Sequence, residues 1–282
     1  MTSADRSASH TAIGVAAMRA VHQLYDGEPR ILDDPIILKL LAPEVLDRTR
    51  AELDRFQTKG MRALRSHVVL RSRYAEDCLA EASARGVQQY ILLGAGFDTF
   101  SYRQPSWAGS LKIFEVDHAA SQEAKRARLD SAGIALPTNL EFVVADFEKH
   151  SLREILERSS FDFSRPAFFS CLGVLVYLDE QSIGDLFRLV GSLAKSTEFV
   201  FTFSPKSREG TDGWNRLAQA VAAVGEPLRT QHDPEPLREE LLASGFTQVH
   251  FLSPEESRLR YYQLRSDYLP PPRHSSIVRA VV

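Results

Sequence analysis

The chain has 282 residues, 44% of them hydrophobic and 25% charged, which suits one large globular domain or a domain with an added cap. Its net charge of -3 offers no basic field and disfavours nucleic acid as a partner. No apolar run approaches the roughly 18 residues of a membrane span, and the N-terminus lacks the apolar core of a signal peptide. The cysteines Cys78 and Cys171 match no metal-ligand spacing, so we expect reduced thiols, no metal and a cytoplasmic protein.

Residues 1–85 are predicted to form a helical cap. Apolar residues between Ile13 and Leu24 recur at helical spacing. Asp34-Pro35 has the pattern of an N-cap followed by proline at the first helical position, which predicts a helix over residues 36–41. Helical patterning resumes near residue 44 and continues, with breaks allowed, to Ala84, where Arg85-Gly86 ends it.

Residues 86–282 are predicted to form the core, within a single structural unit with the cap. Short apolar runs alternate there with helix-length segments, which indicates parallel strands covered on both faces. The predicted helices are 119–132, 151–158, 181–194, 214–224 and 236–244. The predicted strands are 89–93, 111–116, 140–145, 167–172, 199–203, 247–252 and 261–265. The last two strands are close in sequence and are expected to pair as an antiparallel edge, so the expected fold is α/β with a mostly parallel seven-stranded sheet.

A glycine turn followed by a strand-end acid predicts a nucleotide-bearing cofactor. The apolar strand that ends at Leu93 runs into Gly94-Ala95-Gly96, and a second strand ends at Asp117. Glycines let the backbone approach a ligand, and a carboxylate at this position accepts hydrogen bonds from ribose hydroxyls. Thr99 stands where a dinucleotide site has its third glycine, which favours S-adenosyl-L-methionine over NAD, because the former has no pyrophosphate. An NAD(P)-linked oxidoreductase stays the alternative.

Three segments resemble the leucine carboxyl methyltransferase family, and more closely its bacterial branch of S-adenosylmethionine-dependent O-methyltransferases: Leu93–Thr99, Phe114–Asp117 and Gly173–Leu178. N-terminal segments, including Asp33-Asp34-Pro35 and Arg71–Asp77, fit the same branch. The resemblance implies a class I methyltransferase (Rossmann-like) fold with S-adenosyl-L-methionine as cofactor. It also implies O-methylation of a small-molecule carboxylate or hydroxyl.

The resemblance implies roles for most of the candidate cofactor-binding residues. Gly94, Ala95 and Gly96 form the turn under the methionine part, and Asp117 binds the ribose. After the third predicted strand, Asp146 contacts the adenine amino group and Phe147 covers the ring.

The amino-acid end of the cofactor needs a cation and a hydrogen-bond acceptor. A guanidinium before the first strand matches the cofactor carboxylate. The resemblance, matched through the spacing of the family's cofactor-binding arginine to Gly94, implies Arg71 and leaves Arg73 open. Leu172 is a candidate cofactor-binding residue, at the position where leucine carboxyl methyltransferases have a glutamate that holds the cofactor's amino group. A main-chain carbonyl near residues 170–172 is the expected substitute. Asp98 is either a hydrogen-bond partner near the amino group or a cap for the next helix.

No catalytic constellation is evident, and Tyr177, Tyr102 and His67 are weak candidates for catalytic residues. The methyl group of the cofactor is already activated, so alignment of the reacting atoms is the main requirement. A carboxylate acceptor needs no general base at neutral pH, whereas a hydroxyl benefits from one. A protein that binds S-adenosyl-L-methionine without transferring methyl is a further alternative, and the sequence specifies neither the acceptor nor the oligomeric state.

Overall fold

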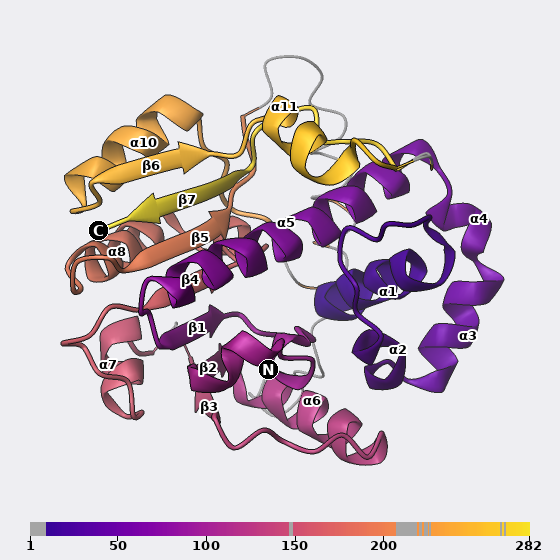
Figure 1. Cartoon of the computed structure of the whole chain (residues 1–282), viewed down its shortest axis with the longest axis horizontal. Helices are drawn as coiled ribbons and strands as arrows, with labels where there is room; N and C mark the ends of the chain where they lie inside the picture. The colour runs from indigo at the N-terminus through magenta and orange to yellow at the C-terminus, as the bar shows by residue number, and fades with distance from the viewer. Residues whose placement is uncertain are drawn as a thin grey trace.

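The computed structural model describes residues 10–146, 149–206, 219, 222, 225, 227–265, 267 and 269–282. Within this part, a seven-stranded sheet has the strand order β3-β2-β1-β4-β5-β7-β6. Strands β1 to β5 are parallel, and β7 is antiparallel to both β5 and β6 (Figure 1). The strands are β1 (Gln89–Leu93), β2 (Lys112–Asp117), β3 (Leu140–Val144), β4 (Phe168–Cys171), β5 (Glu198–Thr202), β6 (Gln248–Phe251) and β7 (Ile277–Val281).

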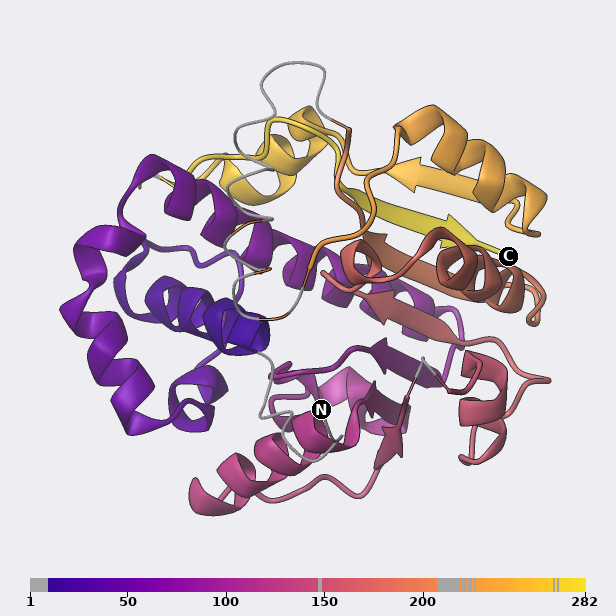
Figure 2. The ribbon, with the colours of Figure 1, turned by 180° about the vertical axis from the view of Figure 1, so that it is seen from behind.

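Helices cover both faces of this sheet. Strand alternation directs Tyr90 and Leu92 into a core cluster with α5, and Ile91 and Leu93 into a second cluster with α7, α8 and α10. Figure 1 shows α5 in front of the strands, and Figure 2 shows α8 against the opposite face. The core helices are α5 (Lys59–Ala84), α6 (Ala119–Ser131), α7 (Leu152–Glu157), α8 (Glu180–Gly191), α10 (Pro234–Ala243) and α11 (Pro254–Ser257).

The N-terminal segment is helical, as its pattern predicts. It contains α1 (His10–Tyr25), α2 (Ile36–Leu40), α3 (Pro43–Ala51) and α4 (Leu53–Phe56), which lead into α5. Asp34 Oδ1 accepts a hydrogen bond from the backbone N–H of Ile37 at 3.3 Å, in the capping role expected of it. The predicted helical run from residue 44 to 84 is broken into three helices.

Six of the predicted strands are present, each within one residue at either end, but the strand predicted at 261–265 is wrong. Ser253 caps α11 by accepting from the Glu256 N–H, Pro254 occupies the first turn, and the helical path continues into the π-helical turn η4 (Arg258–Tyr262). The seventh strand is β7 instead, and it lies between β5 and β6 rather than at the edge. The predicted helix 214–224 lies largely outside the described residues.

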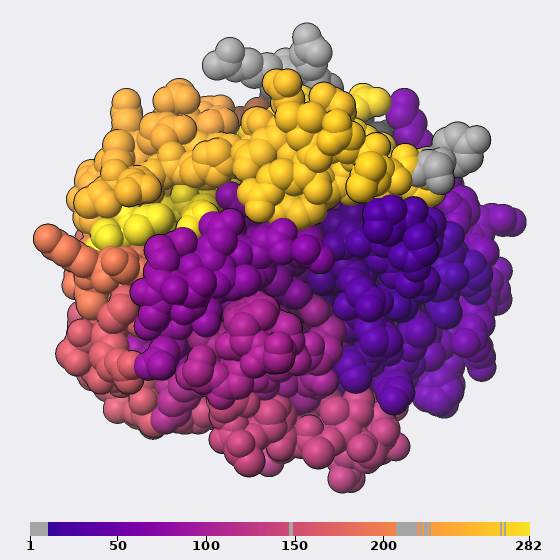
Figure 3. All heavy atoms as spheres, in the orientation of Figure 1, coloured from indigo at the N-terminus to yellow at the C-terminus, as the bar shows by residue number. Residues whose placement is uncertain are grey.

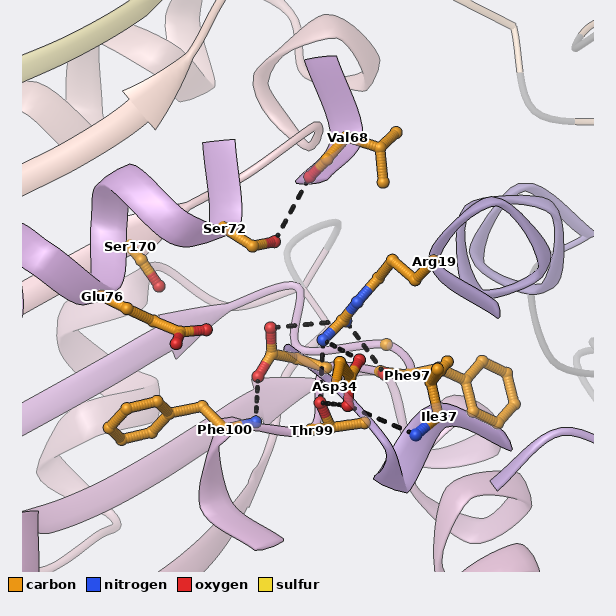
Figure 4. Close-up of polar contacts among 12 residues, drawn as sticks. Arg19, Asp34, Ile37, Val68, Ser72, Glu76, Phe97, Thr99, Phe100 and Ser170 are labelled. Carbon is orange, nitrogen blue, oxygen red and sulfur yellow. Dashed lines mark hydrogen bonds and ion pairs between the residues drawn. The ribbon is translucent and has the colours of Figure 1, made fainter. Parts of the chain in front are cut away.

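The cap and the C-terminal segment both contact the core. Arg19 of α1 reaches Asp34 and the loop after β1 (Figure 4). The hydroxyls of Ser66 and Tyr262 lie 2.5 Å apart, which joins α5 to the C-terminal segment. Figure 3 shows this segment, in yellow, lying over α5 and the indigo cap. No helix in the described part of the chain has both the length and the apolar character needed to cross a membrane.

Candidate functional site

A cavity of about 170 Å³ lies at the carboxyl ends of β1, β2 and β4, where ligands bind in open α/β sheets. Helix α1 forms part of its wall, together with α5 and the segments that follow the three strands. Seven residues predicted for the site line this cavity: Arg71, Gly94, Ala95, Gly96, Asp117, Leu172 and Tyr177. The fold therefore brings together most of the predicted cofactor-binding residues.

The glycine turn is tied to β2 by backbone hydrogen bonds. The N–H groups of Gly94 and Ala95 both donate to the Val116 carbonyl, at 2.8 and 3.3 Å. Gly94 has a φ of +67°, and a Cβ there would lie 2.4 Å from Cγ2 of Val174. A side chain at position 94 would therefore be strained and would also clash with the segment after β4.

Asp117 ends β2, and its half-buried carboxylate faces the glycine turn. One oxygen accepts from the Gly96 N–H at 2.6 Å, and the other accepts from the His118 N–H at 2.7 Å. A carboxylate oxygen has two acceptor positions, so each oxygen keeps one for a further donor. These two positions suit the paired hydroxyls of a ribose.

Arg71 supplies a cation to the cavity. Its guanidinium lies against Gly173, whose φ is +78°, and a Cβ on Gly173 would be 2.6 Å from Nη1. Burial lowers the pKa of Arg71 to about 10, against the raising effect of Tyr177 and Asp98, so the group stays charged at neutral pH. Among the described residues, no carboxylate forms an ion pair with Arg71.

Arg73 lies outside the cavity. Its side chain is 45% exposed, and Nε is 2.9 Å from Oδ1 of Asp77 on the same helix. The two arginines are two residues apart, which places them on different sides of α5. The structure thus separates the two sequence candidates by position.

Two of the weak catalytic candidates do not line the cavity. His67 lies one turn before Arg71, and burial together with the charge of Arg71 lowers its pKa to about 3, so its imidazole is neutral. Its Nδ1 is 3.4 Å from the Ser276 hydroxyl. The Tyr102 hydroxyl donates to Oε2 of Glu115 at 3.3 Å, inside a buried cluster under α6. Tyr177 does line the cavity, where it is half-buried.

A larger cavity of about 670 Å³ adjoins the first and shares Leu93 and Val174 with it. It lies between α7 and α8, and Lys149 contributes to its rim. Asp146 follows β3 and forms an ion pair with Lys149 at 2.7 Å, whereas Phe147 lies outside the described residues. Ligand pockets usually measure about 300–1,000 Å³, a size that the larger of these two cavities reaches and the smaller does not.

Arg19, which was not among the residues predicted for the site, is only 4% exposed and lines the smaller cavity. Its Nη2 donates to the Thr99 hydroxyl at 2.8 Å and lies 2.6 Å from Asp34 Oδ2 (Figure 4). The residues three positions before and after it, Ala16 and His22, are also buried. Helical spacing therefore placed Arg19 on the buried stripe of α1, which was the available signal.

Comparison with known proteins identifies this arrangement. The model of the leucine carboxyl methyltransferase family matches residues 12–191. The chain belongs to the leucine carboxyl methyltransferase family. The family and the fold class that the sequence motifs predicted are thereby confirmed, and the family's name does not support the oxidoreductase alternative.

Relatives of this family member are named for S-adenosyl-L-methionine, the cofactor predicted from the sequence. The candidate S-adenosyl-L-methionine-dependent methyltransferase YktD of Bacillus subtilis (strain 168) is 30% identical and aligns over 93% of this chain and 93% of its own length. A candidate S-adenosyl-L-methionine-dependent methyltransferase of Mycobacterium tuberculosis (strain ATCC 25177 / H37Ra) is 29% identical, over 90% of this chain and 84% of its own. The cofactor in these names agrees with the one predicted from the glycine turn and Asp117.

Solved structures with the same fold include remote members of the methyltransferase class. A DUF574 family protein from Streptomyces avermitilis has a TM-score of 0.63 at 15% identity, covering 97% of both chains. A candidate methyltransferase from Thermobifida fusca has a TM-score of 0.55 at 19% identity, covering 83% of this chain and 87% of its own. At these identities the likeness establishes the class I fold of this family member and nothing finer.

Proposed function

We propose that this protein is an S-adenosyl-L-methionine-dependent methyltransferase that methylates an oxygen atom of a small molecule, with a carboxylate as the preferred acceptor. The names of the relatives support S-adenosyl-L-methionine as the cofactor. The observation that carries the site assignment is Arg71, a cation without an ion-pair partner among the described residues, in one cavity with the glycine turn and Asp117. A guanidinium there matches the carboxylate of the cofactor's amino-acid end.

The residues of the two cavities divide the cofactor between them. Arg71 holds the amino-acid end, and Asp117 accepts from the ribose hydroxyls with its two remaining acceptor positions. The smaller cavity is small for the whole cofactor, so we place the adenine past Leu93 and Val174, toward the larger cavity. Asp146, beside Lys149 on the rim of that cavity, is then placed to contact the adenine, as the family resemblance implies.

The ionisable groups of the cavity favour an acceptor that is already charged. When bound, the cofactor supplies a sulfonium methyl group that an acceptor oxygen can take up in an in-line displacement. The described lining of the smaller cavity contains no histidine, lysine or glutamate. His67 is neutral but lies outside the lining. A carboxylate acceptor needs no proton removed, whereas a phenol with a pKa of about 10 does.

Cofactor binding is tested first, by titration calorimetry with S-adenosylhomocysteine, the demethylated product. Arg71→Ala should weaken binding about tenfold to a hundredfold, because a charge-assisted hydrogen-bond pair is lost. Arg73→Ala removes the same side chain from the same helix outside the cavity, and it should bind as wild type does. NAD should not bind. Equal affinities for the two variants would remove Arg71 from the site, and binding of NAD alone would favour an oxidoreductase.

The acceptor is tested with labelled S-adenosyl-L-methionine and pools of carboxylic acids, phenols, amines and nucleic acids. Base-labile label, characteristic of a methyl ester, is the expected result. Label found only on nitrogen, carbon or nucleic acid would refute O-methylation. Tight binding without transfer to any pool would favour the non-catalytic binding protein. The proposal also includes a cytoplasmic location, which rests on the buried free thiols Cys78 and Cys171.

A further inference from the structure

The described lining of the cofactor cavity contains two carboxylates, Asp98 and Asp117. Asp117 already accepts two backbone hydrogen bonds, from Gly96 and His118, and it lies at the end of β2. Asp98 comes from a different segment, the loop after β1, two residues beyond the glycine turn. The two acids can therefore serve different parts of one ligand.

The two oxygens of Asp98 are used differently. Oδ1 accepts from the Phe100 N–H at 2.8 Å, at the start of the turn η1 (Phe100–Tyr102), which is a capping role. Oδ2 lies 3.8 Å from Nη1 of Arg19, beyond hydrogen-bond distance, and accepts no hydrogen bond from the described residues. The side chain is 18% exposed and lines the cavity, so this oxygen is available to a ligand.

The surroundings of Asp98 keep it negatively charged. Burial alone would raise its pKa, but Arg19, Lys125 and Arg103 and the Phe100 N–H together hold the pKa below its ordinary value. Arg19 and Arg103 are also engaged by Asp34, and Arg103 by Glu76, so neither arginine is free to neutralise Asp98 alone. An ionised acceptor binds an ammonium more strongly than a neutral one does.

Asp98 and Arg71 are a negative and a positive group in the lining of the cavity, which also includes Arg19 and Asp117. They affect each other's charge but form no ion pair within 4.0 Å, so a gap separates them in the described structure. An α-amino acid carries its ammonium and its carboxylate on one carbon, and it can bridge such a gap by pairing each charge with its opposite. Leu172, also in the lining, has no side-chain acceptor to offer.

We propose that Oδ2 of Asp98 accepts a hydrogen bond from the α-ammonium of the cofactor's methionine part, while Arg71 binds the α-carboxylate. This assignment rests on the proposed function and deepens it. It makes Asp98 a binding residue that also caps η1. The sequence left two roles open for Asp98, as a partner of the amino group or as a cap, and here Oδ2 takes the first and Oδ1 the second. It replaces the main-chain carbonyl near residues 170–172 as the principal acceptor.

The test compares three ligands by titration calorimetry: S-adenosylhomocysteine, its analogue without the α-amino group, and 5′-methylthioadenosine. Asp98→Asn removes the charge at nearly constant shape and should weaken S-adenosylhomocysteine binding about tenfold or more. It should leave the affinity for the other two ligands unchanged, because neither has the ammonium. Asp98→Ser, which keeps an oxygen for the Phe100 N–H, should show the same selective loss if Asp98→Asn fails to fold.

The control is Asp77→Asn, which removes the same charge from a partly buried aspartate outside the cavity and should bind all three ligands normally. Equal weakening of all three ligands by the Asp98 variants would overturn the assignment, because it would show a purely structural role. Unchanged binding of S-adenosylhomocysteine would also overturn it, in favour of a main-chain acceptor. If wild-type protein binds none of the ligands, the proposed function itself fails.

Discussion

At the scale of single residues, the absence of a side chain at Gly173 leaves the space that the Arg71 guanidinium occupies. Gly173→Ala should weaken S-adenosylhomocysteine binding at least about tenfold, because the new Cβ would displace Arg71 from its position. Gly133→Ala is the matched control, since Gly133 has a φ of +63° and a Cβ added there would meet no atom within 4 Å. Both substitutions should cost about 1–2 kcal/mol in backbone strain, measured by chemical unfolding.

The route of this effect is measured by combining Gly173→Ala with Arg71→Ala. If Gly173 acts through the guanidinium, Gly173→Ala should cost little further affinity once Arg71 is gone, and the two losses should not add. Full additivity would contradict the explanation, because it would show that the methyl group of alanine blocks the ligand directly.

His67 should make stability depend on pH in the acid range. Its folded pKa of about 3 lies below the ordinary value of 6.5, so between these limits the unfolded chain binds a proton that the folded chain does not. The free energy of unfolding should therefore fall as the pH drops below about 6.5. His67→Gln should reduce this slope in urea titrations at several pH values, and His274→Gln, at an exposed histidine, should not. An unchanged slope in His67→Gln would refute the prediction.

Spacing to the glycine turn favoured Arg71 as the cation before the first strand but left Arg73 open. The phase of α5 makes the choice, because Val68, Ser72 and Ala75 are buried and fix which side of the helix faces the core. Tyr102, a weak catalytic candidate, lies outside the smaller cavity for a related reason. The connection after β1 is built from short turns, η1 and η2 (Ser106–Ser110), whose direction no periodic pattern encodes.

At the scale of whole elements, the end of α8 and the turn that follows α10 approach so closely that Gly191 packs against the backbone of Ser244 and Gly245. A Cβ on Gly191 would lie 2.0 Å from the Ser244 carbonyl oxygen. Gly191→Ala should therefore destabilise the fold by about 1–3 kcal/mol through overpacking. Gly14→Ala, in the exposed part of α1 with open space around it, should stabilise by about 0.5–1 kcal/mol.

Chemical unfolding of the two variants checks both signs. Stability of Gly191→Ala at or above the wild-type value would show that the helices can separate without cost. Loss of stability in Gly14→Ala would show that α1 is held by a contact that a methyl group disturbs.

Local sequence patterns predicted the buried strands, because a strand covered on both faces has a continuous apolar run. They also predicted the capped helices, because a capping residue marks where each helix begins. They failed for the last strand. The alternation over Tyr261–Arg265 resembles a strand, but the capping serine Ser253 and Pro254 upstream start a helical path that continues through it. The short run Ile277–Val281 becomes a strand because β5 and β6 pair with it. The local sequence of this run does not predict that long-range pairing.

At the scale of the whole molecule, α5 belongs to both the cap and the core. Its buried residues join the core cluster under the sheet, while Ser66 bonds to Tyr262 and to the Pro270 carbonyl. We predict that cap and core unfold in one transition, although 282 residues exceed the roughly 150 for which this is usual. Circular dichroism and tryptophan fluorescence should give coincident melting curves. An early, partial loss of helix would show instead that the cap is a separate unit.

The inner position of β7 has a consequence for synthesis of the chain. Residues 277–281 are the last of the sheet to leave the ribosome, yet they fill the gap between β5 and β6. Until then the apolar strand Glu198–Thr202 has an unpaired edge, which is a template for association with other chains. A nascent chain that stalls before residue 277, or a product clipped there, is the form most dependent on chaperones to avoid aggregation.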